Sequence, residues 1–279
     1  MRNSLHSAQT AQLILLQFLR TDQKNGCQYT FHYFKGLFMD YRILPVGDSA
    51  LTIVFGNEID PEISRIVRIA RKYLSSKKIE GVSEYVQTYA TLMVHYNALV
   101  IGYDELADRL REELSLMDTD GEAGQKRTIL IPVCYGGEYG PDLPTVCAHS
   151  GFSEEEVIRR HTRVDYLIYM LGFMPGFVYL GGMDRAISTP RLKNPRERLE
   201  KGSVGIAADQ TGIYPLVSPG GWQIIGRTPL ELYDHEREKP ILYEAGEYIH
   251  FVPITERRFR EIRQQVEDRT YQYEWIREE

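Results

Sequence analysis

Residues 203–233 read SVGIAADQTGIYPLVSPGGWQIIGRTPLELY, and this stretch decides the fold class of the second half of the chain. Runs of β-forming residues alternate in it with turns that contain glycine, proline or aspartate. The same pattern holds throughout the region after His161, where the strand-like runs are 166–171, 177–180, 203–208, 213–217, 222–225, 230–233 and 248–252. Many short strands separated by such turns are typical of a β-barrel or a β-sandwich. Because two helix starts, at Pro141-Asp142 and at Ser153, precede these strands, the sequence predicts a β domain over 128–255 with leading helices.

The stretch from Met39 to residue 127 predicts a different kind of domain. Strand-like runs alternate there with two amphipathic helices: the strands at 41–46, 50–55, 82–89 and 91–96, the helices from Asp60-Pro61 and over 103–116. The apolar residues of both helices recur at three- and four-residue spacing, so each helix has one face to bury. This order of elements predicts an α+β domain over 39–127, in which helices pack on one face of a small antiparallel sheet.

The two ends of the chain differ from these domains. Residues 1–38 combine the short apolar run 13–19 with polar stretches that have no sustained period. A secretory signal is disfavoured, because Gln17 interrupts that run and no small-residue cleavage site follows it. We expect the native product to begin at Met39 and residues 1–38 to lie outside the fold. Residues 256–279 interleave Arg and Glu and are expected to form a charged, solvated helical tail.

The composition of the 279 residues excludes several classes of protein. With 33 Lys and Arg against 39 Asp and Glu, the net charge is −6, whereas binding nucleic acid through its phosphates requires a clustered basic surface. Three irregularly spaced cysteines make neither a disulfide framework nor a structural zinc site. No apolar run reaches the roughly 18 residues that span a bilayer. We therefore expect a cytoplasmic protein that holds no metal and contacts neither nucleic acid nor membrane.

The glycine-rich loops between residues 161 and 228 form the candidate site. Glycine lets backbone N–H groups approach a ligand, and several such loops at a barrel mouth would bind an anion. Glycine and proline in a β domain usually serve turn geometry, and it is the polar residues in these loops that favour a binding site. Arg191, Lys193 and Arg196 lie close together in this region. Their side chains could capture carboxylate or phosphate, or form a solvated basic loop.

His161 and Asp165 are the candidate acid–base pair. His161 ends a predicted helix, where a cation is favoured by the helix dipole, so a capping role and an acid–base role both fit. Asp165 could orient that histidine or begin the following turn. The candidate catalytic residues are therefore His161, Asp165, Arg191 and Arg196. Candidates for binding the substrate or an anion are Lys193, Lys201, Ser203, Gln210, Ser218, Gly220, Gly221 and Gln223.

Six blocks of this sequence resemble the KipI family, which is also called allophanate hydrolase subunit 1-like and includes the B subunit of bacterial 5-oxoprolinase. They occur in the family's order: IPVCYGGEYGPD at 131–142, EVIRRHT at 156–162, LGFMPGF at 171–177, GSVGIA at 202–207, QTGIYP at 210–215 and SPGGWQIIG at 218–226. The resemblance extends from about Tyr41 to Ile254. Where relatives commonly have Pro-Ala before Gly-Ser-Val, this chain has Glu200-Lys201, which either adds a cation to the site or points outward.

The resemblance implies a cyclophilin-like β-barrel after the small α+β domain. It also implies two partners, a C subunit of related fold and an A subunit of LamB/YcsF type. The assembled subunits open 5-oxoproline to glutamate at the expense of ATP, with magnesium, and the chain would be an ATP-binding part of this hydrolase, active only in the hetero-oligomer. Fused relatives form the carboxyltransferase part of urea carboxylase. The alternative is a protein inhibitor of a sporulation histidine kinase, with Phe173, Phe177 and Trp222 as apolar anchors.

Overall fold

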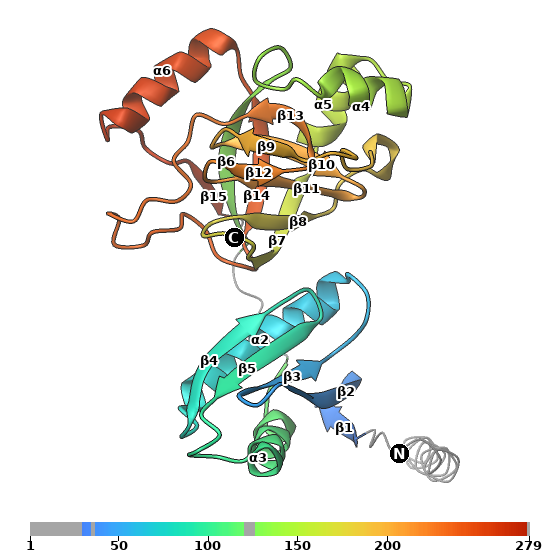
Figure 1. Cartoon of the computed structure of the whole chain (residues 1–279), viewed down its shortest axis with the longest axis vertical. Coiled ribbons are helices and arrows are strands. Elements are labelled where there is room, and N and C mark those ends of the chain that lie inside the picture. The colour runs from blue at the N-terminus through green and yellow to red at the C-terminus, as the bar shows by residue number, and fades with distance from the viewer. Residues whose placement is uncertain (1–29, 35–36, 120–125, 278–279) are drawn as a thin grey trace, which may run out of the picture.

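Two domains lie one above the other in the computed structural model of the chain (Figure 1), which describes residues 30–34, 37–119 and 126–277. The lower domain contains a five-stranded sheet in the order β1-β2-β3-β5-β4, with each neighbouring pair antiparallel. Its elements are β1 Thr30–Phe34, β2 Leu37–Val46, β3 Ala50–Val54, α2 Pro61–Lys77, β4 Val82–Gln87, β5 Thr91–Tyr96 and α3 Tyr103–Ser115. This order confirms the predicted α+β domain.

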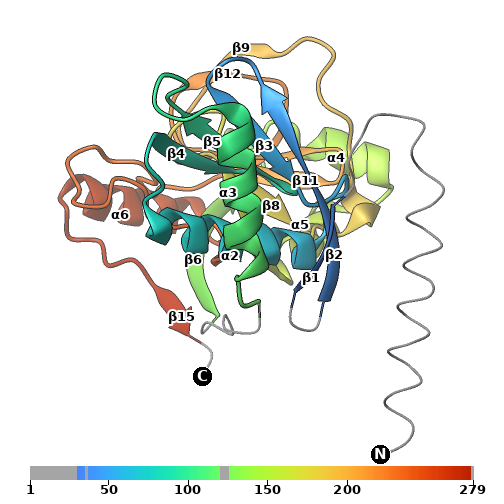
Figure 2. The ribbon, with the colours of Figure 1, turned by 90° about the horizontal axis from the view of Figure 1, so that it is seen from below.

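Helix α2 illustrates how the sequence builds this domain. Asp60 Oδ1 accepts hydrogen bonds from the backbone N–H groups of Glu62 and Ile63, which caps the helix, and Pro61 occupies the first turn. The apolar face of α2 is buried with the sheet and α3 in one core, to which Ile66, Val67, Ala70, Leu74, Leu92, Val94, Leu106 and Leu110 contribute. Each buried Leu, Ile or Val stabilises the domain by about 1.5–3 kcal/mol. Figure 2 shows α3 crossing in front of α2.

The upper domain is a closed barrel of seven strands in the order β13-β10-β11-β8-β7-β14-β6, with β6 also pairing with β13. Only the β14–β6 pair is parallel. An eighth strand, β15, pairs with the beginning of β6. The strands are β6 Arg127–Tyr135, β7 Asp165–Leu171, β8 Val178–Gly181, β10 Ser203–Ala207, β11 Gln210–Tyr214, β13 Gln223–Arg227, β14 Tyr248–Pro253 and β15 Trp275–Arg277. The closed barrel confirms the predicted class of the second domain.

The remaining elements of the upper domain surround this barrel. The helices are α4 Leu143–Ser150, α5 Glu154–Thr162, the 3-10 turn η1 Arg185–Ile187 and α6 Glu256–Glu267. Two further strands, β9 Arg196–Leu199 and β12 Ser218–Gly220, pair only with each other. Figures 1 and 2 both place this β9–β12 ribbon outside the barrel, over β10 and β11.

Four features differ from the predicted ones. The sheet begins before Met39, because Thr30–Phe34 pairs with the first part of β2; residues 1–29 lie outside the described part of the chain. Strand β11 ends at Tyr214, because Pro215 has no N–H group to continue the ladder. The stretch 230–233 forms only an isolated bridge from Tyr233 to Ile241. The tail, which was predicted to be helical throughout, consists of helix α6 and then strand β15, which pairs with the beginning of β6.

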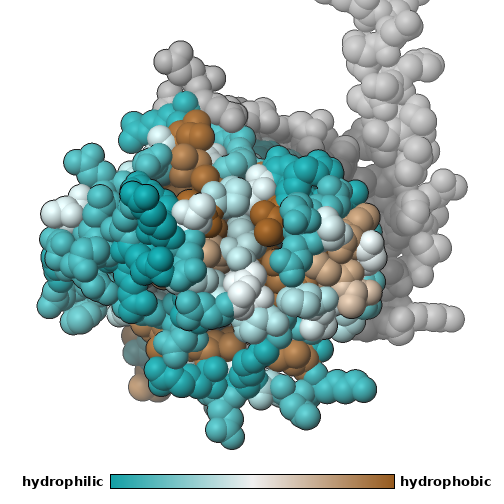
Figure 3. Space-filling view, turned by 90° about the horizontal axis from the view of Figure 1, so that it is seen from above, coloured by the Kyte–Doolittle hydropathy of each residue, from teal (hydrophilic) through white to brown (hydrophobic). Residues whose placement is uncertain are grey.

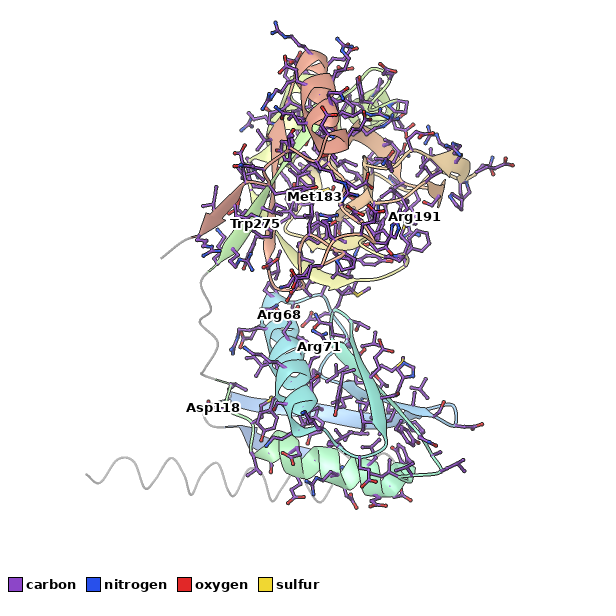
Figure 4. The ribbon with its side chains drawn as sticks, turned by 90° about the vertical axis from the view of Figure 1, so that its left-hand side faces the viewer. Arg68, Arg71, Asp118, Met183, Arg191 and Trp275 are labelled. Atoms are coloured by element: carbon purple, nitrogen blue, oxygen red, sulfur yellow. The ribbon has the colours of Figure 1, made fainter. Side chains whose placement is uncertain are left out.

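The β4–β5 hairpin of the lower domain contacts the barrel. Gln87 Nε2 donates to the carbonyl oxygen of Tyr169 at 3.2 Å, and Gln210 Nε2 donates to the phenol oxygen of Tyr89 at 2.6 Å. Arg68 of α2, in the part of the helix nearest the barrel (Figure 4), packs against Gly246 so closely that a Cβ there would lie 2.5 Å from Arg68 Nε. The domains therefore meet through specific side chains.

The described helices include none that is both long and apolar enough to cross a lipid bilayer. Seen from above, the surface of the barrel domain is mostly hydrophilic, with small and separate hydrophobic patches (Figure 3).

Candidate functional site

An aromatic cluster lies on the outer wall of the barrel, beneath the β9–β12 ribbon. We call it the outer-wall cluster; its buried members are Phe177, Leu199, Ala207, Tyr214, Trp222 and Ile224. The ring of Phe177 lies 5.2 Å from that of Tyr214 and 5.5 Å from that of Trp222, in edge-on arrangements that aromatic rings favour. The barrel interior has a separate core of residues that alternate with these along the strands, including Val204, Ile206, Ile213 and Ile225.

This alternation corrects the expected location of the site. Successive side chains of a strand point to opposite faces, so Tyr214 and Ile224 face outward because Ile213 and Ile225 face inward. Trp222 and the Arg191 guanidinium that contacts it therefore lie on the outer wall, whereas the sequence predicted the site at the barrel mouth.

Arg191 lies over this cluster. Its Cζ is 5.9 Å from the centroid of the Trp222 ring, a distance that suits a cation–π contact. Two hydrogen bonds fix the backbone around it: Leu192 N–H donates to the carbonyl oxygen of Gly221 at 2.7 Å, and Gln223 Nε2 donates to that of Pro190 at 2.9 Å. Among the described residues no acidic side chain forms an ion pair with Arg191, so its exposed guanidinium group can bind an external anion.

Lys193 and two buried polar atoms add to the polar character of this surface. Lys193 is exposed, two residues after Arg191. The side chain of Gln223 is buried, and its Oε1 has no hydrogen-bond partner within the described ranges; the same holds for Ser218 Oγ. A buried polar atom of this kind gains a hydrogen bond when a water molecule or a ligand group reaches it. Arg191 and Lys193 are thus exposed, whereas Ser218 Oγ and Gln223 Oε1 are buried. A common role of these four residues in binding an anion stays a prediction.

Arg196 has a structural partner that the sequence did not reveal. Its Nη1 and Nη2 donate to Oδ2 and Oδ1 of Asp142 at 2.8 and 2.7 Å. Asp142 is buried and also accepts the backbone N–H of Ile224 at 2.7 Å. The guanidinium group thus fastens β9 to the barrel, which differs from the expected catalytic role. The only hint of Asp142 in the sequence was its place in the Gly-Pro-Asp block.

His161 lies in the barrel core, not at a reactive surface. The hydroxyl of Thr211 donates to the carbonyl oxygen of Gly205, so Thr211 Oγ1 accepts a hydrogen bond from His161 Nε2–H at 2.8 Å. His161 Nδ1 then accepts from the hydroxyl of Tyr135 at 2.8 Å, and the ring stacks on Phe251. Complete burial lowers the pKa of His161 from 6.5 to about 3, so the ring is neutral. This arrangement gives His161 a structural role.

Asp165 does not orient His161. Its Oδ1 pairs with His250 Nδ1 and its Oδ2 with Lys126 Nζ, both at 2.7 Å. Burial by itself would raise the pKa of Asp165, but the hydrogen bonds from Lys126 and His250 lower it below its ordinary value. Of the two roles considered for Asp165, the orientation of His161 is wrong, because Asp165 begins β7 with its side chain partly exposed whereas His161 points into the core.

Four other predicted residues have contacts within the chain. Lys201 pairs with Glu231 at 2.5 Å, so it points to that carboxylate. Ser203 is buried and donates to the carbonyl oxygen of Glu200. Gln210 contacts Tyr89 of the other domain. Gly220 lies in β12, where a Cβ would meet Leu199 and Tyr214 at 2.5 and 2.6 Å.

Phe173 is a further exposed residue beside the site. Its side chain is 65% exposed, and its φ of 67° lies in the left-handed region that non-glycine residues avoid. Phe177 and Trp222, the other two apolar anchors considered for a partner protein, are 2% and 5% exposed because they form the outer-wall cluster. Of the three aromatic residues, Phe173 is the one available to a partner.

The described residues contain no group of three His, Cys, Asp or Glu side chains that could hold a metal ion. The magnesium that the resemblance implies stays an expectation for the assembled enzyme, and we assign it no step through this chain.

Comparisons with known proteins match this arrangement of domains. The family model for the carboxyltransferase domain, subdomain C and D, matches residues 41–243. The B subunit of the Bacillus subtilis 5-oxoprolinase is 41% identical over 227 residues, which cover 78% of this chain and 94% of that protein. The B subunit of the Escherichia coli O157:H7 5-oxoprolinase is 37% identical over 216 residues, covering 76% and 95%.

A solved structure has the same fold. The urea carboxylase of Kluyveromyces lactis superposes with a TM-score of 0.73 over 90% of this chain and 25% of its own, at 16% sequence identity. At that identity the likeness concerns the fold alone. The sequence matches confirm the resemblance on which the expected domain order was based.

Proposed function

Because the chain belongs to the family of the carboxyltransferase domain, subdomain C and D, we propose that it is the B subunit of an ATP-dependent 5-oxoprolinase. The observation that carries the proposal is the 41% identity to the B subunit of a 5-oxoprolinase over 94% of that protein's length. Similarity over a whole subunit favours the same role more strongly than a match to one motif.

Arg191 and Lys193 are the residues of this chain that we propose to contact the substrate. A lactam is a poor electrophile, and transfer of a phosphoryl group to its oxygen creates a leaving group before water attacks. Both 5-oxoproline, through its carboxylate, and a transferring phosphoryl group present negative charge. A planar guanidinium group binds such anions in a bidentate manner, and a fixed cation stabilises charge that develops during transfer. The Trp222 ring beneath Arg191 holds that guanidinium in place without neutralising it.

The reaction also needs other subunits. We propose that this chain acts only in a complex with a C subunit of related fold and an A subunit of LamB/YcsF type, and that ATP binds between subunits. The exposed cations Arg191 and Lys193 favour a shared site, because a second protein surface beside them would exclude water and strengthen their attraction for an anion.

Reconstitution tests the proposal. The chain is purified alone and with its A and C partners, and glutamate release from 5-oxoproline and ATP is measured. We expect release only from the complete mixture. Absence of glutamate from the complete mixture, under conditions where a known 5-oxoprolinase complex is active, would contradict the assignment.

Two arginine variants test the proposed contact. Arg191→Ala should lower kcat/KM of the complex by about 100-fold, as loss of one charged transition-state contact does. Arg198→Ala is the matched control, because Arg198 lies seven residues further along the chain, in β9, is exposed and pairs with Glu200 at 3.0 Å. It should retain wild-type activity. Equal activity of both variants would remove Arg191 from the site.

The alternative, inhibition of a histidine kinase, has one structural argument, the exposed Phe173. In the proposed enzyme this side chain contacts a partner subunit. We expect the lone chain to leave autophosphorylation of a sporulation histidine kinase unchanged and Phe173→Ser to weaken assembly with the C subunit. Inhibition of the kinase by the lone chain, lost in Phe173→Ser, would favour the alternative.

A further inference from the structure

The tip of the β4–β5 hairpin places Tyr89 against the barrel wall. Its ring lies 5.4 Å from that of Tyr169 and 5.9 Å from that of Tyr179, on the neighbouring strands β7 and β8. The side chain of Gln210, at the start of β11, donates to the Tyr89 phenol oxygen. Burial raises the pKa of Tyr89 well above its ordinary value. One residue of the lower domain thus contacts three strands of the barrel.

Tyr89 is the first of a continuous series of rings that ends beneath Arg191. Tyr179 lies 5.1 Å from Phe177, and Phe177 lies 5.5 Å from Trp222, which supports the Arg191 guanidinium at 5.9 Å. Protein interiors are packed as densely as organic crystals, so a displaced ring shifts its neighbours instead of moving into empty space.

Glycines in the barrel strands make room for these rings. At Gly181 on β8 a Cβ would lie 1.9 Å from Tyr169 Cε2, which is impossible without moving that ring. At Gly212 on β11 it would lie 3.0 Å from Trp222 Cζ3. Glycine weakens a strand by roughly 0.5–1 kcal/mol relative to alanine. The glycine therefore lowers the intrinsic stability of β8 and of β11, and the packing of the Tyr169 and Trp222 rings offsets this loss.

We infer that Tyr89 is a positioning residue for the outer wall: by seating Tyr179 and Phe177, the lower domain sets the position of Trp222 and hence of Arg191. This inference rests on the proposed function only where it treats Arg191 as the anion-binding residue. It assigns the small domain a part in shaping a site to which this chain contributes residues of the barrel domain alone.

The fluorescence of Trp222 reports whether Tyr89 controls the packing around that ring. The chain has two tryptophans, and Trp275→Phe leaves Trp222 as the only one while keeping an aromatic ring beside Arg127. In this background Tyr89→Ala removes the contact ring. Tyr89→Leu is a second variant that retains apolar volume in case the first does not fold. Val86→Ala is the matched control on the same hairpin, with an exposed side chain.

Two measurements on the full chain are made. The first is the emission maximum of Trp222 and its quenching by acrylamide. The second is the affinity for inorganic pyrophosphate, by titration calorimetry. In Tyr89→Ala and Tyr89→Leu we expect a red-shifted emission and a quenching constant raised about twofold, because the loosened rings admit the quencher. Pyrophosphate affinity should fall roughly tenfold, since a displaced cation binds an anion less well. Val86→Ala should match the parent in both.

The outcomes separate this inference from the proposed function. Folded Tyr89 variants with unchanged emission and quenching would overturn the inference. If the parent does not bind pyrophosphate, or if Arg191→Ala binds it as well as the parent does, the anion site is wrong and the fluorescence result alone decides the coupling. In the reconstituted complex, a positioning role also predicts that Tyr89→Leu lowers kcat more than it raises KM, whereas simple loss of stability would change neither parameter of the folded fraction.

Discussion

His161 should make the stability of the barrel domain depend on pH. Its pKa is lowered by burial from 6.5 to about 3, so the folded chain excludes a proton that the unfolded chain accepts below pH 6.5. The stability that this histidine contributes is therefore complete above pH 6.5 and declines as the pH falls toward 3. At pH 5 the unfolded chain carries a proton on His161 that the folded chain does not. Because pH 5 lies about 1.5 pH units below the pKa of the unfolded state, this difference lowers the free energy of unfolding by about 2 kcal/mol.

The variant His161→Gln isolates this effect. A glutamine offers one acceptor for the Tyr135 hydroxyl and one donor for Thr211, and it does not titrate. Urea unfolding of the wild type and the variant is measured at pH 7 and at pH 5 by circular dichroism. We expect the wild type to lose about 2 kcal/mol more than the variant between the two pH values.

His149→Gln is the matched control, because His149 is an exposed histidine on the adjacent helix α4. It should show the same pH dependence as the wild type. If His161→Gln loses as much stability between pH 7 and pH 5 as the wild type, His161 is not buried in its neutral form and the hydrogen-bond network deduced above is incorrect.

The other predictions concern packing and ion pairs. Arg196→Ala leaves the buried carboxylate of Asp142 without its partner and should cost about 2–3 kcal/mol in urea unfolding; a change below about 0.5 kcal/mol would refute the structural role. Gly181→Ala forces a methyl group against the Tyr169 ring and should cost about 1–3 kcal/mol, measured in the same way; a neutral result would mean that the ring can move aside. Lys201→Ala breaks an exposed ion pair, so stability should change by less than about 1 kcal/mol and glutamate release should be unaffected; lost activity would return Lys201 to the site.

Local patterns in the sequence were sufficient to predict most of the helices and strands and their order along the chain. The Asp60-Pro61 cap and the apolar spacing that follows predicted α2, which begins at Pro61. The alternation of strand-like runs with glycine and proline predicted a barrel or sandwich, and the structure has a closed barrel. These features depend on residues near one another in the chain, where propensity, capping and hydrophobic period act directly.

Tertiary structure decided the roles of the charged and polar side chains. His161 and Asp165 are four residues apart, yet one points into the core and the other pairs with His250, 85 residues further along. Arg191 and Arg196 look alike in sequence, but only Arg196 meets Asp142, 54 residues earlier. A side chain's charge, pKa and availability depend on what folding brings next to it, and such long-range neighbours leave no periodic signal in the sequence.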